Sequence, residues 1–300
     1  CIGASHAESP VHIIKKHQEN KLCTDEEQKI LDIFLRAGLL SQSNKDILSE
    51  DQSEDSIAYL SFAPTYACNC RCEYCFGEFG NSYQGIPRFF DTENLHFMLD
   101  YFFYKAIPDV THYRIDFVSR GEHLLNLEII KQTVDYVKSF QLRENKRVSI
   151  WLCTNGSLVT PEIASYFYDN NFFVGISVDG RQEHNDSVRK DALGNGTYSQ
   201  ICRGIHTIQQ HNQFHNNLWG LCTATNQNCD FSDLLVHMRQ LGFSNVQIRL
   251  VRGELHYDLP KIKREYSRLS DMLFKSFCQG DLLYFRMILN DNDQYGKVLK

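Results

Sequence analysis

The chain has 300 residues, of which 42% are hydrophobic and 23% are charged, and its formal net charge at pH 7 is −6. This is the balance of a soluble globular protein with room for a sizeable core, and the acidic net charge argues against nucleic acid as a partner. No apolar run approaches the roughly 18 residues that a membrane helix needs. The N-terminus has no signal-peptide pattern, so we expect a cytoplasmic protein with no membrane partner.

The first 55 residues predict a small helical appendage. Residues 24–27, TDEE, form a capping box, and Ile30, Ile33, Phe34 and Ala37 follow at helical spacing as far as a glycine. A polar and acidic stretch at 41–56 is typical of a linker. We therefore expect an appendage over 1–55, either a plain extension or a peptide-recognition element, followed by one domain over 56–300.

From residue 57 onward, strand and helix patterns alternate. Candidate strands lie at 57–63, 112–119, 147–153, 172–178, 218–224 and 245–251. Apolar residues at helical spacing recur between or after them, in the segments 127–137, 201–208 and 262–277. This alternation predicts an α/β fold with a parallel sheet, either closed into a partial barrel or open and doubly wound.

Polar residues follow the first four predicted strands, at the strand ends where parallel α/β sheets bind ligands. In chain order they are a cysteine-rich stretch at 67–77, Arg120-Gly121-Glu122, Thr154-Asn155-Gly156 and Asp179-Gly180. The carboxyl ends of parallel strands meet at one edge, so these groups are expected to lie close together. The sequence therefore predicts one site that combines the cysteines with polar side chains.

Eleven cysteines are present, and four of them gather in the stretch ACNCRCEYCFG at 67–77. The other seven are scattered without a CxxC pairing, as small buried hydrophobes often are. Thiols crowded in one loop indicate a metal site in a reduced protein rather than a disulfide framework. One CxxC pair, Cys72–Cys75, stands without the second pair of a closed zinc site, so the spacing favours an iron–sulfur cluster over zinc or a structural accident.

The pattern Cys68-x3-Cys72-x2-Cys75, with Tyr74 before the last cysteine, resembles the signature of the radical S-adenosylmethionine (SAM) enzymes. The segments FVSRGEHLLN at 117–126, TNGSL at 154–158 and ISVDGRQEHNDSVRKDALGNGTY at 176–198 are similar to the SPASM-type peptide and sulfatase maturases of this family. The resemblance covers about residues 57–290. It implies a partial (β/α)6 barrel of the radical SAM type, one 4Fe–4S cluster, SAM, and an external electron donor of the flavodoxin or ferredoxin type.

The resemblance also implies roles for individual residues. Cys68, Cys72 and Cys75 match the cluster ligands, which leave one iron open for SAM, so Cys70 is not expected to ligate. The implied SAM-binding residues are Gly121 and Glu122 at the amino group, Ser177 and Arg189 at the ribose and carboxylate, Tyr74 and Phe76 at the adenine, and Asn155. Arg120 and His123 stand where the family has glycine and proline, which raises the alternative of an impaired enzyme.

The implied function is a maturase that cleaves SAM reductively and abstracts a hydrogen atom from a peptide or protein substrate. The segments FGEFGNSYQG and DLPKIKREYSRLSDMLF most resemble the thioether-forming maturases of ribosomally made peptides. The alternatives are an anaerobic sulfatase-maturase-like enzyme, a catalytically impaired relative and a zinc-binding interaction module. With Cys278 as the one cysteine of the last seventy residues, the auxiliary-cluster domain of the SPASM type is expected to be absent.

Overall fold

The structure is a computed structural model that describes residues 24, 25, 28, 57–75, 89–106, 110–118, 120–211, 217–251, 258–278 and 284–288. The chain divides into two compact units, one of residues 1–54 with 263–283 and one of residues 55–262 with 284–300. In the first unit, the amide of Gln28 donates to the carbonyl of Thr24 at 2.8 Å, at the start of the predicted N-terminal helix. The predicted linker at 41–56 lies outside the described residues.

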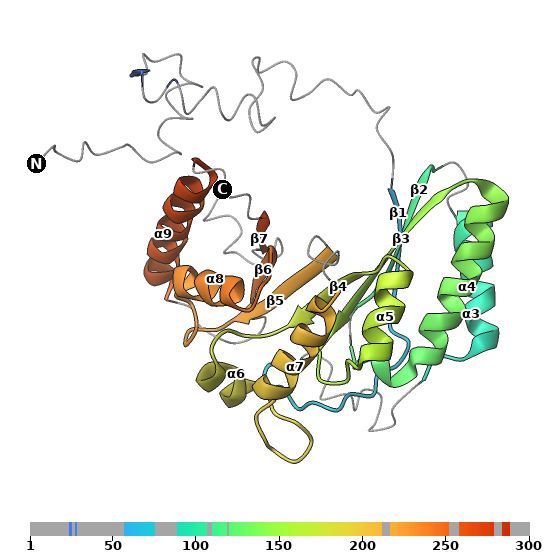
Figure 1. The fold of residues 1–300 in the computed structure, drawn as a ribbon, viewed down its shortest axis with the longest axis horizontal. Helices are drawn as coiled ribbons and strands as arrows, with labels where there is room; N and C mark the ends of the chain where they lie inside the picture. Colours follow the sequence, from blue (N-terminus) through green and yellow to red (C-terminus); the bar gives the residue numbers. More distant parts are fainter. Residues whose placement is uncertain are drawn as a thin grey trace, which may run out of the picture. The chain divides into compact units, whose positions relative to one another are not determined.

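The second unit is built on one parallel sheet (Figure 1). Its strands are β1 (Ile57–Phe62), β2 (His112–Phe117), β3 (Arg147–Thr154), β4 (Phe173–Ser177), β5 (Leu218–Ala224), β6 (Asn245–Leu250) and β7 (Tyr284–Ile288). They lie in sequential order, each parallel to the next. A doubly wound sheet would reverse its strand order at a switch point, so the sequential order confirms the partial barrel. The first six strands match the predicted ones, and β7 was not predicted.

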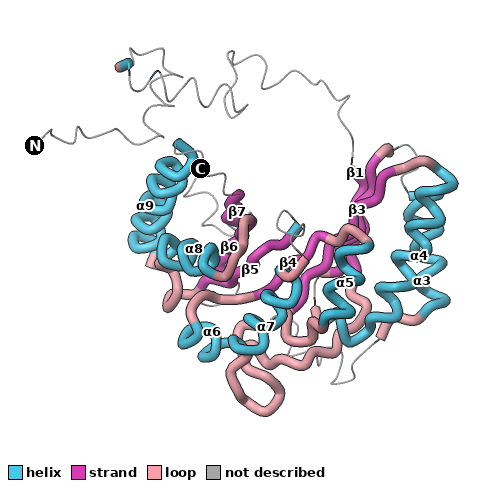
Figure 2. Tube along the Cα trace, in the orientation of Figure 1, coloured by secondary structure: helices cyan, strands magenta, loops and turns pink. Residues whose placement is uncertain are grey.

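The connections between strands are mainly helical, and Figure 2 shows these helices along the outside of the curved sheet. They are α3 (Thr92–Tyr101) with a π-helical turn η2 (Phe102–Ala106), a 3-10 turn η3 (His123–Asn126), α4 (Leu127–Glu144), α5 (Pro161–Asp169), α6 (Gln182–Val188), α7 (Tyr198–Gln209) and α8 (Phe231–Gln240). A further helix, α9 (Leu259–Cys278), belongs mostly to the first unit. Among the described residues, no helix is both long and apolar enough to cross a membrane.

Short polar side chains begin several of these helices. Asp91 caps α3 by accepting from the amide of Asn94 at 2.8 Å, and Asp230 caps α8 by accepting from the amide of Asp233 at 2.9 Å. Each such bond satisfies an amide that has no partner inside its helix. At the other end of α4, Asn145 adopts a left-handed conformation with φ of 50°, which stops the helix before β3.

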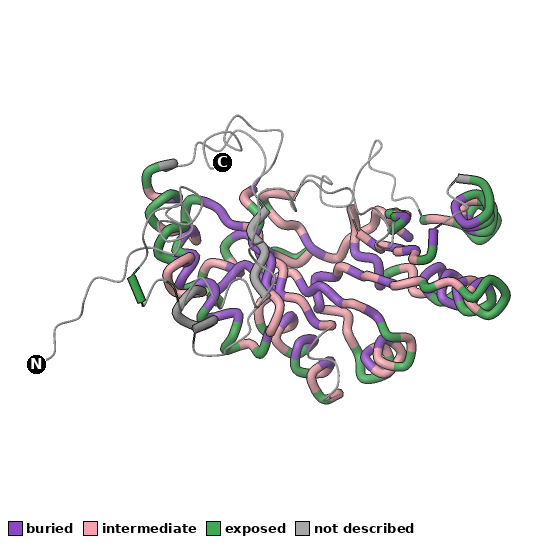
Figure 3. The backbone as a smooth tube through the Cα atoms, turned by 90° about the horizontal axis from the view of Figure 1, so that it is seen from above, coloured by how far each residue is buried: buried purple, intermediate pink, exposed green. Residues whose placement is uncertain are grey.

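Buried and less buried residues alternate along several strands (Figure 3), so the two faces of the sheet differ in burial. The outer face, toward the helices, is buried and apolar; among its residues are Tyr113, Ile115, Phe117, Ile150, Leu152, Val174, Ile176, Val246 and Ile248. Burying such side chains contributes about 1.5–3 kcal/mol each. The inner face carries the alternating positions, and most of these are only partly buried and polar or aromatic; they include Tyr59, Arg114, Asp116, Trp151, Cys153, Phe173, Trp219 and Arg249.

Candidate functional site

The cysteine loop follows β1 and runs antiparallel to residues 188–191, at the C-terminal end of α6. Cys70 pairs with Asp191 in an isolated antiparallel bridge. The amide of Arg71 donates to the carbonyl of Lys190 at 2.6 Å, and the amide of Glu73 donates to the carbonyl of Val188 at 2.8 Å. These main-chain bonds fix the path of the loop and therefore the backbone positions of its cysteines.

Gly121, at the end of β2, packs directly on the backbone of the cysteine loop. Its φ is +83°, a left-handed value that L side chains rarely adopt. A Cβ atom at this position would lie 2.3 Å from the carbonyl oxygen of Thr65 and 2.9 Å from that of Ala67. The neighbouring amide of Glu122 donates to the same Ala67 carbonyl at 2.8 Å. This glycine is therefore required for the contact between the second strand end and the cysteine loop.

Glu122 is 1% exposed and joins the ends of β2 and β3. Its Oε1 accepts from the Leu124 amide at 3.2 Å and from the Thr154 hydroxyl at 2.7 Å, and its Oε2 accepts from the Asn155 amide at 2.7 Å. Desolvation raises the pKa of this carboxyl, against the lowering by its three donors. A carboxylate has about four acceptor positions, so one position on Oε2 stays available to a further donor.

Asn155 ties the third strand end to the cysteine loop through Asn69, which lies between Cys68 and Cys70. The Asn155 Nδ2 donates to Asn69 Oδ1 at 2.8 Å, and the Asn69 Nδ2 donates to the hydroxyl of Ser157 at 2.8 Å. Ser157 in turn donates to Asn155 Oδ1 at 2.6 Å. Sequence reasoning missed Asn69, although its place inside the cysteine stretch was a signal.

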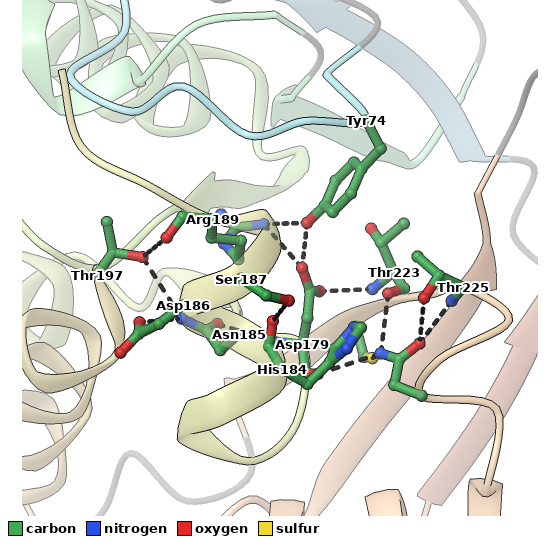
Figure 4. Close-up of polar contacts among 12 residues, drawn as sticks. Tyr74, Asp179, His184, Asn185, Asp186, Ser187, Arg189, Thr197, Thr223 and Thr225 are labelled. Atoms are coloured by element: carbon green, nitrogen blue, oxygen red, sulfur yellow. Dashed lines mark hydrogen bonds and ion pairs between the residues drawn. The ribbon is translucent and has the colours of Figure 1, made fainter. Parts of the chain in front are cut away.

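A buried triad of Tyr74, Asp179 and Arg189 connects the loop to the fourth strand end (Figure 4). The Tyr74 hydroxyl donates to Asp179 Oδ2 and accepts from Arg189 Nη1 at 2.6 Å. Arg189 Nη1 also lies 3.6 Å from Asp179 Oδ2, with the two side chains 8% and 0% exposed. Burial raises the pKa of the Tyr74 phenol well above its ordinary value, so the phenol stays a neutral donor.

Asp179 is itself held from three sides. Its Oδ1 accepts from the Thr223 amide at 2.8 Å, its amide donates to Asn185 Oδ1 at 3.2 Å, and its carbonyl accepts from Asn228 Nδ2 at 3.1 Å. The sequence marked this residue as the end of a strand and the start of a turn. The structure adds that its carboxylate contacts both the Tyr74 hydroxyl and the Arg189 guanidinium. These contacts join distant parts of the chain, so no local sequence pattern predicts them.

The four clustered cysteines differ in their exposure to solvent. Cys68, Cys72 and Cys75 are partly exposed, whereas Cys70 is 3% exposed. A hydrogen bond from the Cys70 thiol lowers the pKa of Cys68, while burial raises the pKa of Cys72 to about 11, a rise that Arg189 opposes. Metal ligation requires thiolates, and three accessible thiols of one loop beside an arginine are suitable donors for a cluster.

Within the described ranges, no three His, Cys, Asp or Glu side chains lie close enough together to coordinate a single metal ion. The thiolates of an iron–sulfur cluster bind different irons and are therefore spread more widely than the ligands of one ion. SAM also finds fitting groups. The Nε of Arg189 is buried and has no hydrogen-bond partner among the described residues, which suits a carboxylate, and Glu122 keeps an acceptor position for an ammonium group.

The remaining predicted residues are placed as follows. Ser177 ends β4 and is half-buried. Phe76 lies outside the described residues. Arg120 follows β2 and is half-buried, and in the described part of the chain its guanidinium makes no ion pair or hydrogen bond. The structure thus brings Glu122 and Asn155 together at the Cys68 end of the loop, and Tyr74 and Arg189 at the other end.

We expect Tyr74→Phe to lower the free energy of unfolding by about 1–3 kcal/mol, because it leaves a buried carboxylate and guanidinium without their shared partner. Tyr136→Phe is a matched control. Its hydroxyl also donates to an aspartate, Asp100, but at an exposed position, so its loss should cost less than about 0.5 kcal/mol. Urea unfolding of both variants tests this, and equal costs would contradict a structural role for the triad.

His123 should make the protein acid-sensitive. It is 1% exposed, and burial lowers its pKa to about 4, whereas an unfolded histidine titrates near 6.5. Between these values the unfolded chain binds the extra proton, so stability falls as the pH drops through about 6.5. The loss reaches about 2 kcal/mol by about pH 5.

The test is the slope of unfolding free energy against pH. His123→Gln should flatten the slope between about pH 7 and 5, whereas the exposed His96 should leave it unchanged when replaced by glutamine. An unaltered slope in His123→Gln would show that another group carries the acid sensitivity.

The chain is similar in sequence to known enzymes. No family model matches the chain. It is 30% identical over 157 residues to a serine-type anaerobic sulfatase-maturating enzyme of Bacteroides thetaiotaomicron, covering 51% of this chain and 37% of that protein. It is 26% identical over 245 residues to a cysteine-type anaerobic sulfatase-maturating enzyme of Clostridium novyi, covering 77% of this chain and 63% of that one. The chain thus spans less than two thirds of the length of either relative.

Solved structures show the same fold. The structure of His6-tagged anSMEcpe with bound AdoMet (SAM) has a TM-score of 0.66 at 23% identity, covering 77% of this chain and 61% of that one. A second structure, native anSMEcpe with bound AdoMet and the Cp18Cys peptide, has a TM-score of 0.65 at 23% identity, with 77% and 63% covered. The partial barrel is therefore confirmed, and the relatives that the chain resembles in sequence are named as enzymes.

Proposed function

We propose that this protein is a radical SAM enzyme that cleaves SAM reductively and abstracts a hydrogen atom from a peptide or protein substrate. The observation that carries the proposal is the set of three partly exposed cysteines on one loop, with the fourth one buried. A carbonyl of that loop accepts from the amide of Glu122, whose carboxylate is buried, and the loop lies beside the buried guanidinium of Arg189, which has an unused donor among the described residues. A cluster and the amino-acid part of SAM require these groups.

Each residue has a role under this proposal. Cys68, Cys72 and Cys75 hold a 4Fe–4S cluster, which when bound supplies the electron for SAM cleavage. Arg189 donates through Nε to the SAM carboxylate, and Glu122 accepts from its ammonium group. In addition, Tyr74 and Phe76 frame the adenine, Ser177 binds the ribose, and Gly121 and Asn155 keep the second and third strand ends against the loop.

The substrate is proposed to be a peptide segment, either free or within a protein. The relatives are named as sulfatase-maturating enzymes, and solved structures of one of them contain bound peptides. This support favours the sulfatase-maturase-like alternative. The thioether-type prediction rests on sequence segments alone, one of which, 76–85, lies outside the described residues. An external flavodoxin- or ferredoxin-type donor completes the proposal. A reducing cytoplasm is proposed because the eight cysteines whose side chains are described are free.

The test is anaerobic reconstitution with iron and sulfide, followed by SAM and a chemical reductant. We expect a coloured protein that releases 5′-deoxyadenosine. A colourless protein that takes up stoichiometric zinc would refute the proposal in favour of the zinc-binding module. A confirmed cluster without 5′-deoxyadenosine would identify the impaired relative, and an Arg120→Gly variant that regains activity would then locate the defect.

A further inference from the structure

The inner face of the sheet carries two arginines whose guanidinium groups are held in fixed positions. Arg114, on β2, forms a two-point ion pair with Asp116, with Nε–Oδ1 at 2.5 Å and Nη2–Oδ2 at 2.9 Å. The same guanidinium lies over the Trp151 ring at 3.9 Å and over the Tyr59 ring at 5.3 Å. Arg114 is therefore a rigid part of this face rather than a solvated side chain.

Arg249, on β6, is held by a neutral partner. In the amide orientation that satisfies both groups, Gln247 Oε1 accepts from Arg249 Nε at 2.7 Å and from Nη2 at 2.9 Å. Gln247 is 8% exposed, whereas Arg249 is exposed. Because an amide carries no net charge, this arrangement orients the guanidinium, and no described side chain forms an ion pair with it.

Aromatic rings form the floor between the two arginines. Trp151 stacks on Phe173 with centroids 4.4 Å apart and an interplanar angle of 7°. Trp151 also lies 5.6 Å from Trp219, and the strand register places these rings on β3, β4 and β5, between the strands of the arginines. Flat rings of this kind pack against a peptide chain at a low entropic cost.

The charge of this face is opposite to that of the whole chain. Among its described side chains, Arg114 is paired with Asp116, Arg249 adds a positive charge that is held by a neutral amide, and His112 lies 3.2 Å from the Ser149 hydroxyl. The chain as a whole has a net charge of −6. A cationic face on an acidic protein selects an anionic ligand, since the rest of the surface repels it.

We propose that the inner face binds an acidic stretch of the peptide substrate, with Arg249 facing its carboxylates and the aromatic floor, on which the Arg114–Asp116 pair is fixed, lying against the neighbouring residues. This inference rests on the proposed function for the identity of the ligand as a peptide. It adds the chemical class of the sequence that the enzyme selects. The face adjoins the site, because Cys153, on the inner side of β3, is directly followed by Thr154, which donates to Glu122.

The experiment measures the fluorescence anisotropy of a labelled peptide of glycine and serine with a central Glu-Cys-Glu, on the reconstituted 300-residue chain. Its twin carries Gln-Cys-Gln. At about 50 mM salt we expect the acidic peptide to bind about tenfold more tightly, with the difference largely lost at about 500 mM salt. Arg249→Gln should reduce the ratio to about twofold or less, and Arg249→Lys should keep part of it.

Two controls localise the binding. Arg203→Gln removes the same charge from an exposed position on α7, in the outer layer, and should leave the ratio unchanged. Trp151 and Trp219 are the only two tryptophans of the chain, so tryptophan emission should change with the acidic peptide and follow the same binding curve.

Three results would overturn the inference: equal affinity for the two peptides, an unchanged ratio in Arg249→Gln, or tighter binding of a short single-stranded oligonucleotide of equal charge. The outcomes also separate the two proposals. Arginine-dependent binding without SAM cleavage would support the acidic-peptide face while refuting the enzyme. Cleavage of SAM and modification of both peptides alike would support the enzyme while refuting the acidic selection.

Discussion

Cys72→Ala is expected to abolish both the cluster and SAM cleavage, whereas Cys70→Ala should preserve both. Three thiolates bind three of the four irons and leave one iron open for SAM. Removing one of these ligands leaves the cluster held by two thiolates, which is too few to keep it. Cys70 differs because its side chain is 3% exposed and its backbone pairs with Asp191. Its thiol is therefore enclosed by the protein, and its removal should cost the packing of a small buried group and its hydrogen bond to Cys68.

The measurement is iron and sulfide content, visible absorption and 5′-deoxyadenosine, after identical anaerobic reconstitution of the two variants. We expect about four irons per chain in Cys70→Ala and a background value in Cys72→Ala. Since both variants lose a thiol from the same loop, folding effects are matched. If Cys70→Ala lost the cluster and Cys72→Ala kept it, the ligand assignment would be wrong.

Gly121→Ala is expected to lower the free energy of unfolding by about 4 kcal/mol and to prevent cluster assembly. About 1 kcal/mol comes from placing an L side chain at a left-handed φ. The remaining roughly 3 kcal/mol comes from a contact of 2.3 Å with the Thr65 carbonyl, which no rotamer change can relieve because both partners are backbone-fixed. The loop must move away from the second strand end, and its cysteines move with it.

Gly194→Ala isolates the conformational part of this cost. Gly194 has φ of +87°, close to the +83° of Gly121, but a Cβ there would meet nothing within 4 Å. Its replacement should cost about 1 kcal/mol and leave the iron content unchanged. Urea unfolding and reconstitution of both variants give the comparison, and similar costs at the two glycines would show that the loop does not depend on this close contact.

Hydrophobic patterning predicted the first six strands to within two residues at each end. Along each of these strands, residues that pack into the core alternate with residues on the inner face. This alternation has a period of two, which is visible in the sequence. The strand β7 (Tyr284–Ile288) was not predicted, although its pairing with β6 is parallel like the others. A run of five residues is too short for its hydrophobic period to distinguish a strand from a helix. Only its pairing with β6 identifies it as a strand.

The sequence also located the site at the strand ends, but it assigned Glu122 and Tyr74 by resemblance alone. The structure shows that the Glu122 carboxylate already accepts three protein hydrogen bonds, and that the Tyr74 hydroxyl is shared by Asp179 and Arg189. These partners are separated from them by up to 115 positions. Contacts between distant segments depend on how strand ends converge, and no local spacing encodes that.

The sequence by itself determined the alternating α/β architecture, the cysteine loop after the first strand, and the polar groups that share its edge of the sheet. These features follow from periodicity and from the direction of parallel strands, both of which are local. Only the tertiary structure decided that Cys70 is buried, that Asp179 holds Tyr74 beside Arg189, and that Arg249 lies on the same inner face as Arg114. Each of these depends on the curvature of the sheet, because curvature sets which side chains from distant strands meet.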